Sequence, residues 1–205
     1  MPNLKRQFRI GVVANYVHLR DNLVHNVESD NYDYISHAYF NYYIDNENSP
    51  TFASRGWKFN LNGKYIMPVI KLEDGSRMSH SFILKADING SIAIGKKHSL
   101  KLGATAGTSL LAQEPPLSYQ FFLGGQSHMN YFDNIISFDG LRFTQLYGDH
   151  ITLAKISWQY NFYKNLYAIA NINGGYISTD YDQWFNDNNF VIGCGITFGM
   201  NTMAG

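Results

Sequence analysis

Apolar and polar residues alternate along most of the chain. Between residues 57 and 67 the odd positions are apolar apart from Gly63, and lysine and asparagine occupy the even positions up to residue 64. The same two-residue period recurs at residues 8–16, 32–44, 82–94, 100–110, 154–162, 166–172 and 190–198. Side chains of a strand point alternately to its two faces, so this period predicts about eight β-strands and no helix.

The predicted strands are long, and their polar face is weakly charged. Most of them reach ten residues or more, whereas a soluble strand has about five or six residues and a membrane-crossing strand needs roughly nine to eleven. The polar positions carry asparagine, glycine, serine, threonine and glutamine with scattered lysine, as in the wet interior of a barrel. The pattern therefore predicts an all-β fold, an antiparallel transmembrane β-barrel with about eight long strands.

The connections between these segments alternate in length. Short turns follow residues 94 and 163, and long connections occupy residues 20–31, 67–79, 111–147 and 175–189. Outer-membrane barrels have short periplasmic turns and long extracellular loops. The connection at 45–55 is the exception, because its place in this order predicts a periplasmic turn although it has about ten residues.

Composition narrows the possible partners. Aromatic and charged residues each make up 16% of the chain, whereas charged residues alone supply about a quarter of a typical soluble domain. Sixteen basic residues balance sixteen acidic ones, and the longest basic cluster is Lys96-Lys97, so we expect no nucleic-acid partner. The single cysteine, Cys194, excludes an internal disulfide and a multi-cysteine metal site.

Candidate chemical groups are dispersed. None of the seven histidines stands at ligand spacing from another histidine or from the cysteine, so unrelated histidines are a better interpretation than a metal site. The pairs Asp30 with Asp33 and Asp180 with Asp182 could form an acid–base pair or a Ca²⁺ site, but solvated loop acids are favoured. We expect no cofactor, no metal ion and no catalytic residue in this segment.

Lysines and glycines stand out on the polar face of the strands. The lysines either form a mildly cationic surface for a polypeptide or anionic lipid headgroups, or belong to an ordinary polar lining, and the many amides favour the second interpretation. The glycines at 103–107 and 193–195 indicate a barrel interior that requires small side chains. The five lysines are Lys58, Lys64, Lys85, Lys101 and Lys155.

The exceptional connection carries the first family resemblance. The stretch "DNENSPTFASRGWKFNL" resembles the periplasmic turn motif of the bacterial surface antigen superfamily, with Pro50, Arg55 and Gly56 as its motif residues. These are sixteen-stranded outer-membrane barrels related to the Bam assembly factor and to two-partner secretion pores. The resemblance implies that the chain supplies about half of such a barrel.

A longer stretch carries the second resemblance. Residues 119–176, "YQFFLGGQSHMNYFDNIISFDGLRFTQLYGDHITLAKISWQYNFYKNLYAIANINGGY", are similar to the lid-loop region in the C-terminal barrels of Bacteroidetes patatin-like phospholipases. The resemblance implies a lid at about 112–147 that folds back into the lumen. Its implied residues are Gly124 and Gly125 at the entry, and Gly140, Arg142 and Phe143 at the tip.

Two residues of the lid region depart from the family pattern. The superfamily usually has Val-Arg-Gly-Phe at the tip, whereas this chain has Gly-Leu-Arg-Phe at 140–143. The following interior strand usually offers the lid arginine a carboxylate, and here the possible partners of Arg142 are Asn171 and Asn173. An amide accepts a hydrogen bond but forms no charge-assisted bidentate pair.

The resemblance implies a function for the whole chain. Residues 1–205 would form part of a C-terminal outer-membrane β-barrel domain, as an internal segment that anchors or exports an upstream patatin-like phospholipase, a lipid acyl hydrolase. No Gly-x-Ser-x-Gly elbow occurs here. The expected location is the bacterial outer membrane, and the expected partners are outer-membrane lipid, the rest of the barrel, an upstream hydrolase or periplasmic domain, and the insertion machinery.

Two alternatives remain open at this point. One is an outer-membrane protein insertase or polypeptide transporter of the same superfamily, which would carry repeated periplasmic domains upstream. The other is a complete small eight-stranded barrel with a structural role.

Overall fold

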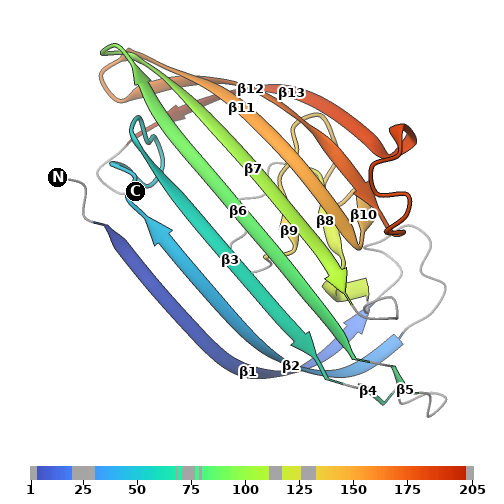
Figure 1. Ribbon diagram of the computed structural model, residues 1–205. Helices are drawn as coiled ribbons and strands as arrows, with labels where there is room; N and C mark the ends of the chain where they lie inside the picture. The colour runs from blue at the N-terminus through green and yellow to red at the C-terminus, as the bar shows by residue number, and fades with distance from the viewer. Residues whose placement is uncertain are drawn as a thin grey trace.

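The computed structural model describes residues 4–19, 31–67, 69–70, 77–78, 80–110, 117–125 and 133–201. Eight long strands form one antiparallel sheet, which confirms the predicted fold class (Figure 1). The strands follow the chain order across the sheet: β1 (Lys5–Leu19), β2 (Asn31–Asp45), β3 (Gly56–Ile66), β6 (Ser81–Ile94), β7 (His98–Leu110), β11 (His150–Tyr163), β12 (Leu166–Ser178) and β13 (Phe190–Met200).

The remaining elements are short and lie in the connections. A two-stranded ribbon joins β4 (Val69–Ile70) to β5 (Arg77–Met78) between β3 and β6. The chain segment that connects β7 to β11 forms a separate three-stranded sheet with the order β10-β8-β9. Its strands are β8 (Phe121–Leu123), β9 (Ile135–Ile136) and β10 (Leu146–Gly148), and the 3₁₀ turns are η1 (Leu117–Tyr119) and η2 (Asp187–Asn189).

The large sheet curves into an open trough. Each inner strand pairs with two neighbours, while β1 and β13 lie at opposite edges and do not pair with each other. A complete eight-stranded barrel would need those two strands to pair. The small sheet lies on the concave side of the trough, as Figure 1 shows.

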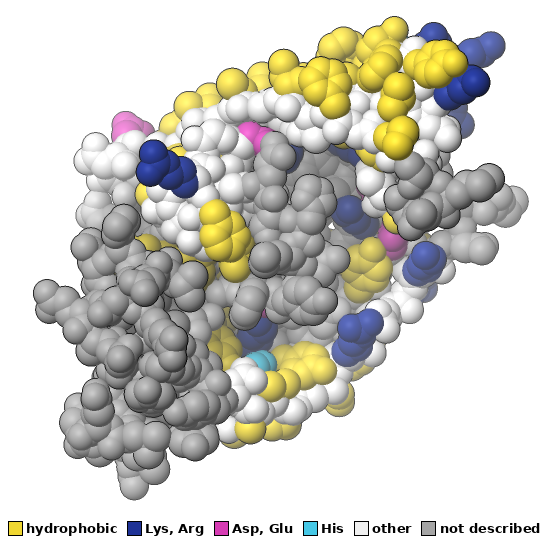
Figure 2. Space-filling model, turned by 180° about the vertical axis from the view of Figure 1, so that it is seen from behind, with side chains coloured by type: hydrophobic (Ala, Val, Ile, Leu, Met, Phe, Trp, Pro, Cys, Tyr) yellow, Lys and Arg dark blue, Asp and Glu magenta, His cyan; other side chains and the backbone are white. Residues whose placement is uncertain are grey.

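The two faces of the sheet differ as the alternation predicts. The side chains of Ile10, Ile196 and Phe198 on the convex face are 70% exposed or more, and Figure 2 shows hydrophobic side chains along the outer surface. Asn171, Asn173 and other polar residues on the concave face are buried. A continuous apolar outer face of this kind is suited to lipid, because a soluble monomer rarely exposes so large an apolar patch.

Among the residues described above, no helix has the length and apolar character needed to cross a membrane.

The central residue of β3 gives a test of the lipid-facing assignment. Leu61 lies on the convex face in register with Tyr42 and Ala86. Leu61→Arg is expected to destabilise the inserted parent protein by about 2–4 kcal/mol, the cost of a cation near the bilayer midplane. The measurement is the heat-modifiable, folded fraction of the parent protein in outer-membrane preparations.

The neighbouring residue provides a matched control. Asn60 faces the concave side in register with Asp87, so an arginine at this position meets a carboxylate and water. Asn60→Arg is therefore expected to leave the folded fraction nearly unchanged. Equal losses in the two variants would contradict the assignment of the faces.

Candidate functional site

Two segments of the chain cross the concave face from opposite ends of the trough. The first, here called the inner insert, comprises residues 117–125 and 133–148, which follow β7 and precede β11 in the sequence. The second, here called the strap, comprises residues 46–55 and joins β2 to β3. The inner insert enters from the end with the long connections, and the strap enters from the end with the short turns (Figure 1).

An apolar core forms where the inner insert meets the sheet. Phe121, Leu123 and Phe138 of the insert are at most 2% exposed and pack in one cluster with Ile151 of β11. Gly107 on β7 makes room for this core, since a Cβ there would lie 2.5 Å from the ring of Phe121. Burial of these aromatic side chains holds the insert against the sheet through the hydrophobic effect.

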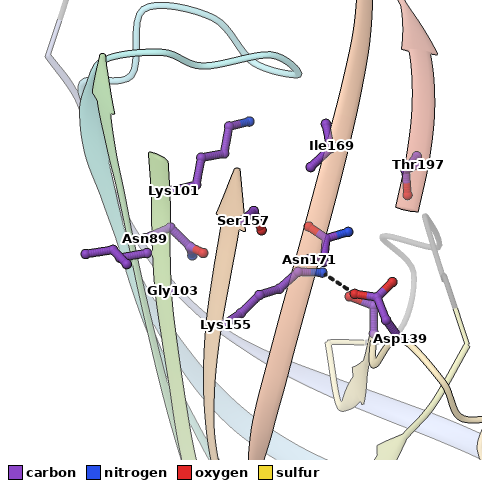
Figure 3. Close-up of a pocket in the computed structure, with 11 residues that line it drawn as sticks. Asn89, Lys101, Gly103, Asp139, Lys155, Ser157, Ile169, Asn171 and Thr197 are labelled. Atoms are coloured by element: carbon purple, nitrogen blue, oxygen red, sulfur yellow. Dashed lines mark hydrogen bonds and ion pairs between the residues drawn. The ribbon is translucent and has the colours of Figure 1, made fainter. Parts of the chain in front are cut away.

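A buried carboxylate fixes the insert to one wall of the trough. Asp139 Oδ2 lies 3.0 Å from Lys155 Nζ on β11 and accepts a hydrogen bond from Asn173 Nδ2 on β12 at 3.3 Å. Figure 3 shows the Lys155–Asp139 contact. A side chain at Gly193 on β13 would overlap the Asp139 carbonyl oxygen, and one at Gly195 would crowd its carboxylate. Strands β11, β12 and β13 therefore together shape a seat for Asp139.

The same insert also contacts the opposite wall. Asp133 Oδ1 lies 2.5 Å from Lys64 Nζ on β3, and its carbonyl oxygen accepts a hydrogen bond from Lys85 Nζ on β6 at 2.7 Å. The Tyr119 hydroxyl lies 2.7 Å from His37 Nδ1 on β2. Burial raises the pKa of Tyr119 above its ordinary value. The inner insert thus spans the trough from β2 and β3 to β11–β13.

The strap crosses the other end of the trough. The ring of Phe52 stacks on Tyr167 of β12 with centroids 4.1 Å apart and planes 5° from parallel. Gly199 on β13 admits this ring, because a Cβ there would lie 2.7 Å from it. Gln159 Nε2 of β11 donates to the Phe52 carbonyl oxygen at 3.4 Å. This reach explains why the predicted turn has an unusual length.

The strap is also held at its own base. Glu47 pairs with Lys58 Nζ at 3.4 Å and accepts a hydrogen bond from Ser91 Oγ at 3.2 Å. Gly56 has a φ of +107°, and a side chain there would overlap the backbone of residue 46. Of the predicted motif residues, Gly56 therefore has a clear backbone role, whereas Pro50 and Arg55 are exposed.

The predicted lid residues all lie in or beside the inner insert. Gly124, Gly125 and Gly140 have positive φ values of 136°, 71° and 96°, which glycine adopts without strain. Arg142 and Phe143 are exposed. Within the described ranges, Arg142 forms no ion pair.

One of the two residues predicted to pair with Arg142 contacts another residue of the inner insert. Asn173 contacts the insert through Asp139 and not through Arg142, while Asn171 is buried beside the adjacent cavity. Sequence reasoning missed Asp139. The available signal was an acidic residue directly before Gly140 and an inward lysine, Lys155, on the following strand.

The inward lysines are largely neutralised by the chain's own acids. Glu47 lies beside Lys58, Asp133 beside Lys64, and Asp139 beside Lys155, and each acid belongs to the strap or to the inner insert. The remaining two also have local partners: Lys85 pairs with Asp87 at 3.3 Å, and Lys101 Nζ donates to the Thr51 carbonyl oxygen at 3.4 Å. These contacts favour the polar-lining interpretation over a free cationic surface.

A cavity of about 360 Å³ lies on the concave face beside Asp139 of the inner insert, and residues of β7, β11 and β12 form most of its lining. Lys101, Ser157 and Asn171 point into it, as Figure 3 shows. The described residues contain no cluster of three or more histidine, cysteine or acidic side chains that could hold a metal ion. The arrangement can close a passage and hold water or a small polar molecule.

A curved antiparallel sheet with an apolar outer face and a polar, segment-filled inner face defines the wall of a membrane β-barrel. The chain belongs to the OMP85 superfamily, whose family model matches residues 3–205. The chain is therefore part of an outer-membrane barrel of the insertase or transporter kind, and its concave face is the lumen. No curated protein matches the chain.

The glycine seat of Asp139 gives a test of insert docking. Gly193→Ala is expected to displace the inner insert, because the added methyl group would overlap the Asp139 carbonyl oxygen. The measurement is the distance distribution between spin labels at Arg142 and Thr179 in a Cys194→Ala background of the parent protein. We expect a broader and longer distribution than in the unsubstituted protein.

A second glycine serves as the control. A Cβ added at Gly90 on β6 would meet nothing within 4 Å, so Gly90→Ala makes the same chemical change without a clash. Its distance distribution should match that of the unsubstituted protein. An unchanged distribution in Gly193→Ala would refute the docking geometry.

Proposed function

We propose that this chain anchors an upstream patatin-like phospholipase domain in the bacterial outer membrane or exports it across that membrane. The observation that best supports the proposal is that two segments of the chain itself, the inner insert and the strap, cross the lumen. A barrel that anchors a domain needs no permanently open passage, and these two segments cross the concave face at its two ends. The resemblance of residues 119–176 to patatin-like phospholipase barrels supports the same function.

In this proposal, the short turns and the strap face the periplasm, and the long connections face the exterior. Residues 1–205 are part of the C-terminal barrel domain, and residues 112–147 form its lid. Other strands of the same barrel would pair with β1 and β13, because a lipid-exposed edge leaves backbone groups without hydrogen bonds. Outer-membrane lipid would cover the convex face, and assembly machinery would insert the barrel.

A second candidate function is that of an insertase or polypeptide transporter. Membership of the OMP85 superfamily supports it. In that case the inner insert and the strap are gates that leave the lumen when a polypeptide enters. Repeated periplasmic domains upstream, in place of a hydrolase, would distinguish this function from the anchor.

The gene and its product together test the first proposal. We expect the reading frame upstream of Met1 to encode a Gly-x-Ser-x-Gly hydrolase domain and the full-length protein to release fatty acid from phospholipid vesicles. Replacement of the elbow serine by alanine should abolish the release, whereas Asp139→Asn should leave it intact. Repeated periplasmic domains together with absent acyl hydrolysis would refute the anchor and support the transporter.

The ion pair at Asp139 tests whether the inner insert acts as a closed lid. Asp139→Asn is expected to raise the conductance of the purified full-length barrel in planar bilayers severalfold. The amide keeps the shape of the side chain but removes the carboxylate that neutralises Lys155, so the docked state is destabilised.

An exposed acid provides the matched control for the conductance measurement. Asp187 lies in η2, away from the lumen contacts described above. Asp187→Asn should leave the conductance unchanged. If Asp139→Asn also leaves it unchanged, the insert does not close the passage through this ion pair.

A further inference from the structure

A second cavity, of about 540 Å³, lies against the strap at the short-turn end of the lumen. The functions proposed above do not involve this cavity. The strap forms one side of it, and the turn joining β6 to β7 forms another. The stacked rings of Phe52 and Tyr167 contribute to its lining, together with amide side chains such as Asn161. The cavity therefore combines an aromatic surface with polar walls.

The charged residues that line the cavity are all basic. Its lining includes Arg55 of the strap and Lys96 and Lys97 of the β6–β7 turn, and it includes no acidic side chain. Within the part of the chain that the structure describes, none of these three cations forms an ion pair. Figure 2 shows Lys and Arg side chains gathered at this end of the molecule.

The acids near the base of the strap are engaged elsewhere. Asp45 accepts hydrogen bonds from the Tyr43 hydroxyl at 2.9 Å and from the Glu47 backbone N–H at 2.8 Å. The Glu47 carboxylate contacts Lys58 and Ser91. Three neighbouring cations without a local counter-charge favour the binding of an anion.

Two buried polar atoms add a second, independent indication of a ligand. Ser99 and Gln159 both line the cavity and are 2% and 3% exposed. Ser99 Oγ and Gln159 Oε1 make no hydrogen bond within the described residues. Buried polar atoms of native proteins are nearly always satisfied by protein, water or a ligand. A hydroxyl or amino group next to the anion would satisfy both.

We propose that this cavity binds a phosphate group carried by a small polar molecule with hydroxyl or amino groups, the chemistry of a phospholipid headgroup. Lys96, Lys97 and Arg55 receive the phosphate oxygens, and the hydroxyl or amino groups reach Gln159 and Ser99. The phosphodiester of a headgroup carries one negative charge on two non-bridging oxygens and adds two ester oxygens as weaker acceptors, so its tetrahedral group can be reached by more donors than a planar carboxylate. Inorganic phosphate supplies the phosphate oxygens but has no alcohol or amino group.

Calorimetric titration of the purified full-length barrel tests the site with two probes, glycerophosphoethanolamine and inorganic phosphate. The double variant Lys96→Gln with Lys97→Gln is expected to bind both probes about tenfold more weakly or worse, since it loses two charged hydrogen-bond donors. Ser99→Ala is expected to weaken glycerophosphoethanolamine alone. Heat-modifiable migration confirms that each variant remains folded.

Lys164 provides the control on the same end of the barrel. It lies in the neighbouring β11–β12 turn with its amine 5.3 Å from the Tyr163 ring, outside the lining of the cavity. Lys164→Gln should leave both affinities within about twofold of the unsubstituted protein.

Three results would count against the site. If neither probe binds, or if Lys164→Gln weakens binding as much as the double variant does, the phosphate site is refuted. Equal affinity for the two probes would overturn the headgroup assignment. Tighter binding of glycerophosphoethanolamine, lost in the Lys96 and Lys97 variant, would support it.

Discussion

The structure depends on a steric fit between inserted side chains and glycines of the lumen wall. The Phe121 ring lies over Gly107, Phe52 lies against Gly199, and Asp139 occupies the seat left by Gly193 and Gly195. Glycine weakens a strand because it packs no side chain of its own. Here the missing side chains are replaced by those of the inner insert and the strap, so the wall and its inserts form one packed unit.

Charge acts together with this fit. A lysine in a partly buried wall needs a counter-charge, and breaking a buried pair leaves one charge uncompensated. The inner insert and the strap supply acids to Lys58, Lys64 and Lys155. The resemblance implied an insert arginine that faces a wall residue, whereas the insert offers the acid Asp139 and the wall offers the cation. The positive charge therefore lies on the wall and the negative charge on the insert, which is the reverse of the arrangement implied for Arg142.

The period of the sequence was sufficient to predict the large sheet but not the segments inside it. Eight long alternating runs specify eight strands and the face of each residue, since a strand repeats every two residues. The short strands β4, β5 and β8–β10 lack a measurable period and were not predicted. The inner insert was anticipated only from the family resemblance. The contact of the strap with Gln159 joins residues 107 positions apart, and no local pattern encodes such a pairing.

The strap has a consequence for the order in which the molecule is built. It leaves the sheet between the second and third long strands, but its aromatic anchor rests on the last two, β12 and β13. A chain that pairs neighbouring strands in sequence must hold this segment undocked until β12 and β13 have formed, because contacts between distant residues carry a large loop-closure cost. The docked position of the strap therefore requires β12 and β13 to be in place, so the strap cannot dock before these two strands have formed.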